Sequence, residues 1–440
     1  MPFRFGQLLI SSLIVCFSLI AHAQEGDQAL TVDATAPLVT ISPYVLGANY
    51  GPWALVSMDM QEEAANSGVT YFRFPGGRWG DEQNLTHQQV DLFMLQANAW
   101  NAIPGISLRL EDGTPEQAAE LVHYMNIEKG YGVRYWSIGN EPDLFVDYPV
   151  ERLNSEWRAI ALAIRAVDPT LLLIGPEVSQ FPPTIEGDAY TNARREMVRS
   201  FLEANGDLVD IVSIHRYPFP TTLNSPVTTA QDLYQNTPEW DILVENLRQV
   251  IIETVGHELP MAITELNSHW NHVSGGEGTP DSSYHAIWWG DVLGRLIRGR
   301  VAIVNYFTLF SSGTLGAFGL LDRYEVRPTY YVYQLYRQLG DQLLASTSPD
   351  DDVTITAALR ADGALTLIVI NRALESDKTL PVIIAGWADA VGGDAEVWRL
   401  DPTVNAEQVG MVAFTSADDH LSGTLELPAQ SITLIVLPAS

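Results

Sequence analysis

Short apolar runs alternate with longer segments of helical period from residue 44 to about residue 340. The runs are rich in β-branched residues, and each has the length of one buried strand. The segments between them place apolar residues three and four positions apart, as an amphipathic helix does. This alternation predicts βα units around a parallel sheet. We identify eight strands, at 44–48, 70–74, 106–110, 134–138, 171–174, 211–214, 261–264 and 301–307.

The helical segments carry readable start and stop signals. Thr114 offers an N-cap hydroxyl, Pro115 fits the first helical position, and Gly130 follows the segment as a stop. Eight strands, each followed by an amphipathic helix, fit a closed (β/α)8 barrel whose reactive groups lie beyond the strand C-termini. An open doubly wound sheet is the alternative. It would need a cofactor-binding loop at its switch point, and the sequence offers none.

After Gly340 the pattern changes to strands separated by turns. Asp-Gly, Gly-Gly and Asp-Pro turn signals separate these strands, which is typical of a small β-sandwich. The extended pieces 29–33 and 38–41 are expected to add strands to it. The predicted class is therefore α/β, with a TIM barrel at 44–340 and a β-sandwich at 341–440 that residues 24–43 join. The sandwich strands are expected at 353–359, 364–371, 380–384, 396–400, 423–427 and 432–437.

The first 23 residues predict a secretory signal peptide. Arg4 precedes an apolar run at 8–20, and Ala21-His22-Ala23 supplies small residues for cleavage. The run is too short to span a membrane as a mature helix. Cys16, the single cysteine, lies inside the run, and a lipoprotein anchor at Cys16 is the alternative. We expect a secreted protein, extracellular or periplasmic, that has no thiol and no membrane attachment after cleavage.

The composition restricts the partners. With 24 Lys+Arg against 54 Asp+Glu, the net charge is -30, which disfavours nucleic acid and anionic membrane surfaces. Lys129 and Lys378 are the two lysines. The first lies on a predicted helix and the second near the C-terminus, so Schiff-base and pyridoxal chemistry are disfavoured. The chain also lacks G-x-G-x-x-G, Walker A and G-x-S-x-G motifs. We therefore expect a neutral substrate and no cofactor.

Two glutamates follow buried strands in similar settings. Glu141 follows the fourth strand in Gly-Asn-Glu-Pro, and Glu265 ends the seventh in Ile-Thr-Glu. In a barrel, both would lie at the mouth. Glycosidic cleavage needs one carboxylic acid to protonate the leaving oxygen and one carboxylate to attack the anomeric carbon or activate water. The alternative for either glutamate alone is a solvated loop residue.

These motifs, together with Thr-Tyr-Phe-Arg-Phe-Pro-Gly-Gly at 70–77, resemble the clan A retaining glycoside hydrolases. The resemblance runs from about residue 44 to the end of the chain. It is greatest to the branches with arabinofuranosidases, β-xylosidases and bacterial endoglucanases, which also carry a C-terminal β-domain. The resemblance implies that Glu141 is the acid/base, Glu265 the nucleophile, and Asn140 the donor to the sugar 2-hydroxyl.

Four further residues are candidates for substrate binding. Arg73, at the end of the second strand, would keep the nucleophile ionised by a charge-assisted hydrogen bond, and a surface salt bridge is its alternative. His215 and Tyr217 match a His-x-Tyr pattern found in parts of the clan, where the tyrosine contacts the nucleophile. Their alternative is a hydrogen-bonded polar pair at the barrel rim. Trp270 lies in a loop expected to cover the sugar site.

Two features set limits on these assignments. His269 and His272 lie three residues apart, but no third ligand follows at metal-site spacing, so we predict no metal. The eighth strand ends in Phe307-Thr308-Leu309-Phe310, without the tryptophan that the clan often has there.

The sequence thus predicts a secreted retaining O-glycoside hydrolase that cuts within a neutral plant-wall polysaccharide of the β-1,4-glucan or xylan type. An exo-acting α-L-arabinofuranosidase or β-xylosidase, an inverting hydrolase, and a non-catalytic carbohydrate-binding protein on a barrel are the alternatives. A carboxyl separation of ~5 Å indicates retention, and ~6.5–9.5 Å indicates inversion. The sequence carries no signal for an oligomeric state.

Overall fold

The computed structural model describes residues 28–184, 189–219, 222, 224–313, 316–387, 393–417 and 420–439. The predicted signal peptide at 1–23, with Cys16, lies outside the described residues. The chain forms two compact units. One is Ile41–Arg337, and the other combines Met1–Thr40 with Gln338–Ser440.

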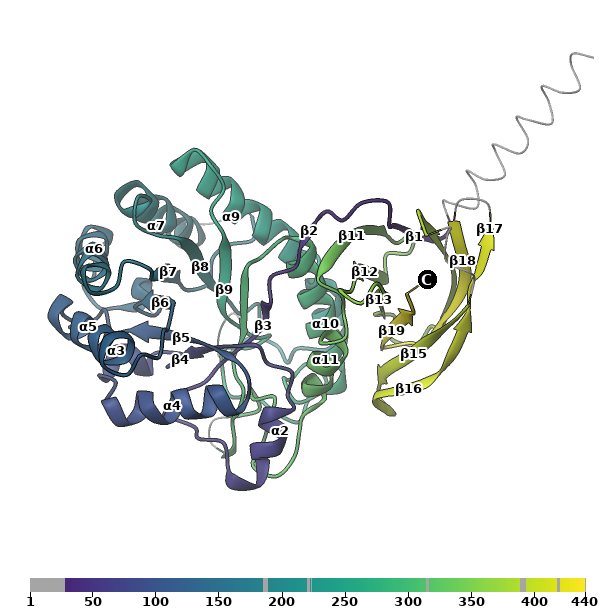
Figure 1. Cartoon of the computed structure of the whole chain (residues 1–440), viewed down its shortest axis with the longest axis horizontal. Helices are drawn as coiled ribbons and strands as arrows, with labels where there is room; N and C mark the ends of the chain where they lie inside the picture. Colours follow the sequence, from purple (N-terminus) through teal and green to yellow (C-terminus); the bar gives the residue numbers. More distant parts are fainter. Residues whose placement is uncertain are drawn as a thin grey trace, which may run out of the picture. The chain divides into compact units, whose positions relative to one another are not determined.

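Eight parallel strands close into a barrel in the first unit, in the order β10-β3-β4-β5-β6-β7-β8-β9 (Figure 1). All eight predicted barrel strands are confirmed, and closure excludes the open doubly wound sheet. Their bounds are β3 Tyr44–Asn49, β4 Tyr71–Phe74, β5 Ile103–Leu108, β6 Tyr135–Ile138, β7 Leu172–Val178, β8 Ile211–Arg216, β9 Met261–Leu266 and β10 Ile303–Tyr306.

Amphipathic helices surround these strands (Figure 1). The predicted cap of α5 is present, because Thr114 Oγ1 accepts the Gln117 N–H at 3.2 Å and Pro115 is the first helical residue. The helices are α2 Gln61–Ala65, α3 Trp79–Glu82, α4 His87–Ala99, α5 Pro115–Val122, α6 Val150–Val167, α7 Ala189–Asn205, α8 Ala230–Asn236, α9 Glu239–Val255, α10 Ser283–Arg298 and α11 Pro328–Tyr336, with one-turn or π-helical segments at Met58–Met60, His123–Glu128 and Pro142–Leu144.

The barrel interior changes from apolar to polar along the strands. A layer of buried side chains from six of the eight strands fills the lower part, and it consists of Tyr71, Tyr135, Ile174, Ile211, Ala262 and Ile303. Because side chains alternate along a strand, the next inward position after Tyr71 is Arg73, and after Ala262 it is Thr264. Tightly packed rings therefore support a buried polar layer at the C-terminal ends of the strands.

The second unit is a β-sandwich whose strands follow the order β16-β15-β19-β13-β12-β11-β1-β14-β18-β17, with β2 also on β11. The N-terminal β1 pairs with β11 and with β14, and so links the two layers that enclose the apolar core. The predicted TIM barrel with a β-sandwich is therefore confirmed. The strands are β1 Leu30–Asp33, β2 Val39–Thr40, β11 Gln342–Thr347, β12 Val353–Leu359, β13 Leu365–Asn371, β14 Lys378–Ala385, β15 Asp394–Asp401, β16 Val404–Ala413, β17 Thr415–Ala417, β18 His420–Leu427 and β19 Ser431–Leu437.

Three of these strands were not predicted, namely β11, β16 and β17. Strands β16 and β17 are largely exposed and lie at the two ends of the strand order, so they lack the buried alternate positions that mark a strand in sequence. None of the helices within the described ranges is both long and apolar enough to cross a lipid bilayer.

The barrel packing yields a stability prediction at Gly105. A Cβ atom there would lie 1.9 Å from Tyr71 Oη, inside the packed layer of rings. We expect Gly105→Ala to lower the free energy of unfolding by about 1–3 kcal/mol, as overpacking does. Gly410→Ala is the matched control, because a Cβ atom there meets nothing within 4 Å. Equal thermal unfolding midpoints for the two variants would contradict the packing described here.

Candidate active site

Glu141 and Glu265 lie together at the mouth of the barrel. Glu265 is on β9, and Glu141 follows β6 in a left-handed backbone conformation, with φ 49°. The backbone N–H of Glu141 donates to the carbonyl of Glu177 at 2.9 Å. One oxygen of each glutamate and one ring nitrogen of His215 all lie within 4.8 Å of one another. The two predicted catalytic carboxyl groups therefore face one another across a short gap.

Arg73 connects the groups of this site from the end of β4. Its Nη1 donates to Glu265 Oε2 at 3.2 Å and to Asn49 Oδ1 at 3.1 Å, and its Nη2 donates to Asn140 Oδ1 at 2.9 Å. The guanidinium is 2% exposed, so the alternative of a surface salt bridge is wrong. Because Oδ1 of Asn140 accepts from Arg73, its amide nitrogen is the atom available to a sugar hydroxyl.

Glu177, at the end of β7, is a buried third carboxylate that sequence reasoning missed. It is 0% exposed, its Oε2 accepts the hydroxyl of Thr264 at 2.6 Å, and the same oxygen lies 3.3 Å from Arg73 Nη2. Burial opposes the charged form, but the Arg73 guanidinium and the His215 contact leave the pKa of Glu177 below its usual value. A glutamate three residues beyond the predicted fifth strand was the available signal.

His215 lies between two of the carboxylates. Its Nδ1 is 3.1 Å from Glu141 Oε1, and its Nε2 is 2.7 Å from Glu177 Oε2. Although burial disfavours the imidazolium, the Glu265 charge and the contacts with Glu141 and Glu177 raise the pKa of His215 to about 9. At neutral pH both ring nitrogens therefore carry protons, and the ring donates to both carboxylates.

Tyr217 and Arg73 divide the two oxygens of Glu265 between them. The Tyr217 hydroxyl donates to Oε1 at 2.6 Å, while Arg73 donates to Oε2. Burial and the nearby carboxylates raise the pKa of Tyr217 well above its usual value, so it remains a phenol. Burial also raises the pKa of Glu265, and the His215 imidazolium opposes that rise. The hydrogen bonds that Tyr217 and Arg73 donate therefore stabilise the carboxylate form of Glu265.

The charges in the site leave a place for one proton. Arg73 and the protonated His215 face three carboxyl groups, those of Glu141, Glu177 and Glu265. With every group ionised, the cluster carries one net negative charge, and one added proton makes it neutral. The lowered pKa of Glu177 keeps that carboxyl group in its charged form.

Trp270, the remaining predicted site residue, lies in the loop after β9 and is 43% exposed. Both ring nitrogens of His269 have hydroxyl partners, Ser268 Oγ at 2.9 Å and Thr228 Oγ1 at 3.1 Å. Burial lowers the pKa of His269 to about 4. The role of the loop over the sugar site stays a prediction.

Among the residues that the structure describes, the ligand atoms of Glu141, His215 and Glu265 have the spacing of a metal site. A metal ion requires a neutral imidazole with a free lone pair. His215 is instead held between two carboxylates as the imidazolium. These three residues are therefore better suited to moving a proton than to binding a cation.

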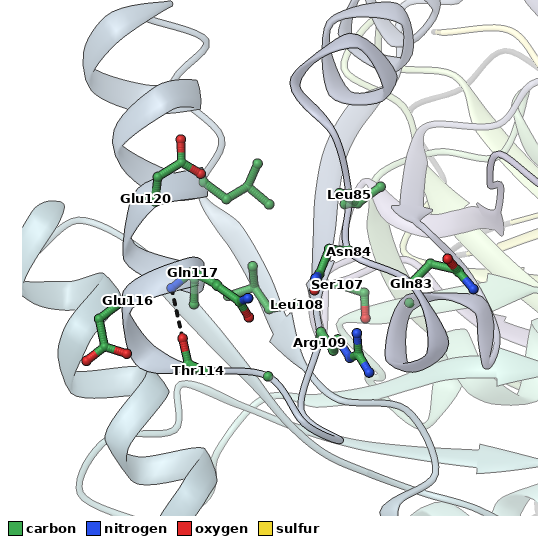
Figure 2. Close-up of a pocket in the computed structure, with 14 residues that line it drawn as sticks. Gln83, Asn84, Leu85, Ser107, Leu108, Arg109, Thr114, Glu116, Gln117 and Glu120 are labelled. Atoms are coloured by element: carbon green, nitrogen blue, oxygen red, sulfur yellow. Dashed lines mark hydrogen bonds between the residues drawn. The ribbon is translucent and has the colours of Figure 1, made fainter.

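A cavity of about 540 Å3 with both polar and apolar walls lies between α5 and the segment that follows α3 (Figure 2). Figure 2 shows Glu116, Gln117 and Glu120 of α5 on one wall, and Gln83 and Asn84 on the other. Neither Glu141 nor Glu265 lines it. The cavity is thus separate from the carboxylate cluster.

Comparison with known proteins sets this geometry in context. No family model matches the chain. Heparanase from Rattus norvegicus is 24% identical over 279 residues, which cover 60% of this chain and 46% of heparanase. The chain spans about half the length of the curated relatives it matches.

Solved structures match over nearly the whole chain. CelM2, a bifunctional glucanase-xylanase from a metagenome library, has a TM-score of 0.70 at 18% identity, with 94% of this chain and 99% of CelM2 covered. The GH51 arabinofuranosidase from Xanthomonas axonopodis pv. citri has a TM-score of 0.73 at 16% identity, with 93% and 100% covered. The chain therefore shares the fold of these glycoside hydrolase structures. The resemblance of its sequence motifs to the clan A retaining glycoside hydrolases agrees with its barrel and its β-domain.

The raised pKa of His215 predicts how stability depends on pH. The stabilisation from the imidazolium is complete below the unfolded pKa of about 6.5 and is lost as the pH rises through about 9. We expect the free energy of unfolding to fall by up to a few kcal/mol between pH 6.5 and 9.5, since one pKa unit corresponds to about 1.4 kcal/mol. Urea unfolding at several pH values measures this fall.

Two variants locate the source of the effect. His215→Gln should remove much of this pH dependence, because the amide side chain cannot titrate. His257→Gln changes an exposed histidine after α9 and should leave the pH dependence as in the wild type. A wild-type pH dependence in the His215 variant would show that other groups cause it.

Proposed function

We propose that this chain is a secreted retaining O-glycoside hydrolase that cleaves a neutral plant-wall polysaccharide of the β-1,4-glucan or xylan type. The observation that carries the mechanism is the distance of at most 4.8 Å between an oxygen of Glu141 and one of Glu265. Retaining enzymes place their two carboxyl groups ~5 Å apart, whereas inverting enzymes leave ~6.5–9.5 Å for a water molecule. The short gap therefore favours retention over inversion.

In the first step, Glu265 attacks the anomeric carbon while Glu141 gives its proton to the leaving oxygen. The glycosidic C–O bond breaks, and a glycosyl ester forms on Glu265. In the second step, Glu141 takes a proton from water, and that water displaces Glu265 from the sugar. The donors on Glu265, Tyr217 and Arg73, hold it as the attacking carboxylate.

The exposure of the two carboxyl groups agrees with these roles. The Glu141 side chain is 20% exposed, and that of Glu265 is 8% exposed. An acid/base must exchange its proton with solvent and water in each turnover, whereas a nucleophile works best when few water molecules compete for it. Because the two carboxyl groups perform both steps, the proposed reaction needs no metal or organic cofactor.

A neutral substrate is favoured by the state of the cations. Arg73 and His215 are each already paired with carboxylates, so neither offers a free charge to an anionic sugar. The net charge of -30 also repels a polyanion. The similar solved structures are a glucanase-xylanase and an arabinofuranosidase, whereas the rat relative is heparanase. An exo-acting α-L-arabinofuranosidase is the second candidate, on the likeness to the GH51 structure. Secretion is proposed from the segment 1–23 alone.

Substitution of the two glutamates tests the roles. We expect Glu265→Ala to form no glycosyl-enzyme, and Glu141→Ala to lose roughly 10²–10⁴-fold in rate, least on substrates with good leaving groups. Azide should give an inverted glycosyl azide with the first variant and a retained one with the second, as NMR of the product would show. Glu203→Ala, an exposed glutamate on α7, is the matched control. Near-normal turnover in either active-site variant refutes the assignment.

The product profile tests the substrate class. Early digestion of a β-1,4-glucan or a xylan by the full chain should release mixed oligosaccharides with a rapid fall in viscosity. Release of monosaccharide alone at constant viscosity would indicate an exo-acting enzyme and favour the arabinofuranosidase or β-xylosidase. Cleavage of heparan sulfate in preference to both would contradict the neutral-substrate argument.

A further inference from the structure

A second cavity, of about 200 Å3, has mainly apolar walls, and Trp53, Trp79, Phe307 and Phe318 are among the residues that line it. The Phe307 N–H donates to the carbonyl of Leu266 at 2.8 Å, so the cavity adjoins the strand that carries Glu265. The Thr308 hydroxyl donates to the carbonyl of Asn49, whose side chain binds Arg73. The lining thus comes from the ends of β10, β3 and β4, the strands on one side of Glu265.

Two of the rings form a fixed platform. Trp53 and Phe307 lie nearly parallel, with ring centroids 5.6 Å apart and 26° between the planes. The Trp53 Nε1 donates to the carbonyl of Gly76 at 3.0 Å, and Phe318 packs edge-on against Phe307 at 5.8 Å. Gly77 keeps the space next to Phe307 open, since a Cβ atom there would lie 3.3 Å from the ring. The platform is therefore held in place before any ligand arrives.

We propose that this aromatic cavity is a subsite for one neutral sugar residue, the neighbour of the residue that is cleaved. The C–H face of a sugar packs on an aromatic face, and its hydroxyls need polar groups at the edge. Arg78 and Glu82 supply such an edge, and they pair with one another at 3.0 Å. Because that pair leaves no unbalanced charge, the edge suits hydroxyls better than a uronate carboxylate.

The position of the cavity decides which sugar it binds, and this step rests on the proposed function. Glu141 protonates the leaving group, so the leaving group extends toward β6, whereas the sugar attacked by Glu265 stays on the side of β9. Neither Glu265 nor Asn140 lines the cavity, so the cleaved sugar itself lies outside it. The cavity accordingly binds the next sugar on the non-reducing side. The eighth strand has no tryptophan at its end. Trp53, which follows β3, and Phe307 together supply an aromatic surface there instead.

Aryl glycosides with one or two sugars test this subsite. The quantity measured is the ratio of kcat/KM for 4-nitrophenyl β-xylobioside to that for the β-xyloside, with the cellobioside and glucoside as a second pair. We expect Trp53→Ala to lower this ratio about tenfold or more, because loss of an aromatic stacking face is worth at least about one factor of ten. Trp53→Phe, which keeps a ring, should restore part of it.

Controls separate this result from damage to the fold. Trp398→Ala, on β15 of the sandwich unit, should leave the ratio unchanged, and Phe307→Leu should lower it if Trp53→Ala does not fold. A wild-type ratio in a well-folded Trp53→Ala variant would overturn the subsite.

If the wild type cleaves neither series, the proposed function fails, and calorimetry with xylotriose and cellotriose then decides whether the subsite exists. At least about tenfold weaker binding by Trp53→Ala supports the subsite, and no binding by the wild type overturns it.

Discussion

The buried pairing of Arg73 and His215 with three carboxylates is the interaction on which the site depends. Each of these charges would be costly inside a barrel, and burial of a single unpaired one would be strongly destabilising. Together the two cations and three carboxylates pair with one another, and the fully ionised cluster has a net charge of one negative unit. A retaining mechanism requires one carboxylic acid beside one carboxylate, and one proton added to this cluster would supply that pair.

Glu177 completes this balance without facing the gap between Glu141 and Glu265. It binds His215 and lies against Arg73, so it fixes the orientation of both cations. Both Glu141 and Glu177 have left-handed backbones, with φ of 49° and 62°. Such conformations cost on the order of 1–3 kcal/mol each outside glycine. The ion pairs and the rings packed below the cluster offset this cost, so the stability of the barrel maintains the geometry of the site.

The sequence predicted the barrel well because its parallel strands are buried on both faces and form apolar runs of recognisable length. The two glutamates at β6 and β9 were also predictable, since each ends such a run in a motif that resembles the clan. Glu177 was missed because the run at 171–174 ended before it, and Gly175-Pro176 resembled a turn. Its partners are distant in sequence. Trp53 was missed for a related reason, because it lies in a turn without hydrophobic period and its role depends on Phe307.

The assignment of Glu265 as the attacking carboxylate is the central claim, and covalent trapping tests it most directly. A 2-deoxy-2-fluoro glycosyl fluoride of a sugar that the wild type hydrolyses should inactivate the protein and stop at the ester. Peptide mass spectrometry should then find one fluoroglycosyl group on Glu265. A label on another residue, or turnover of the same sugar with inversion and no label, would contradict the account.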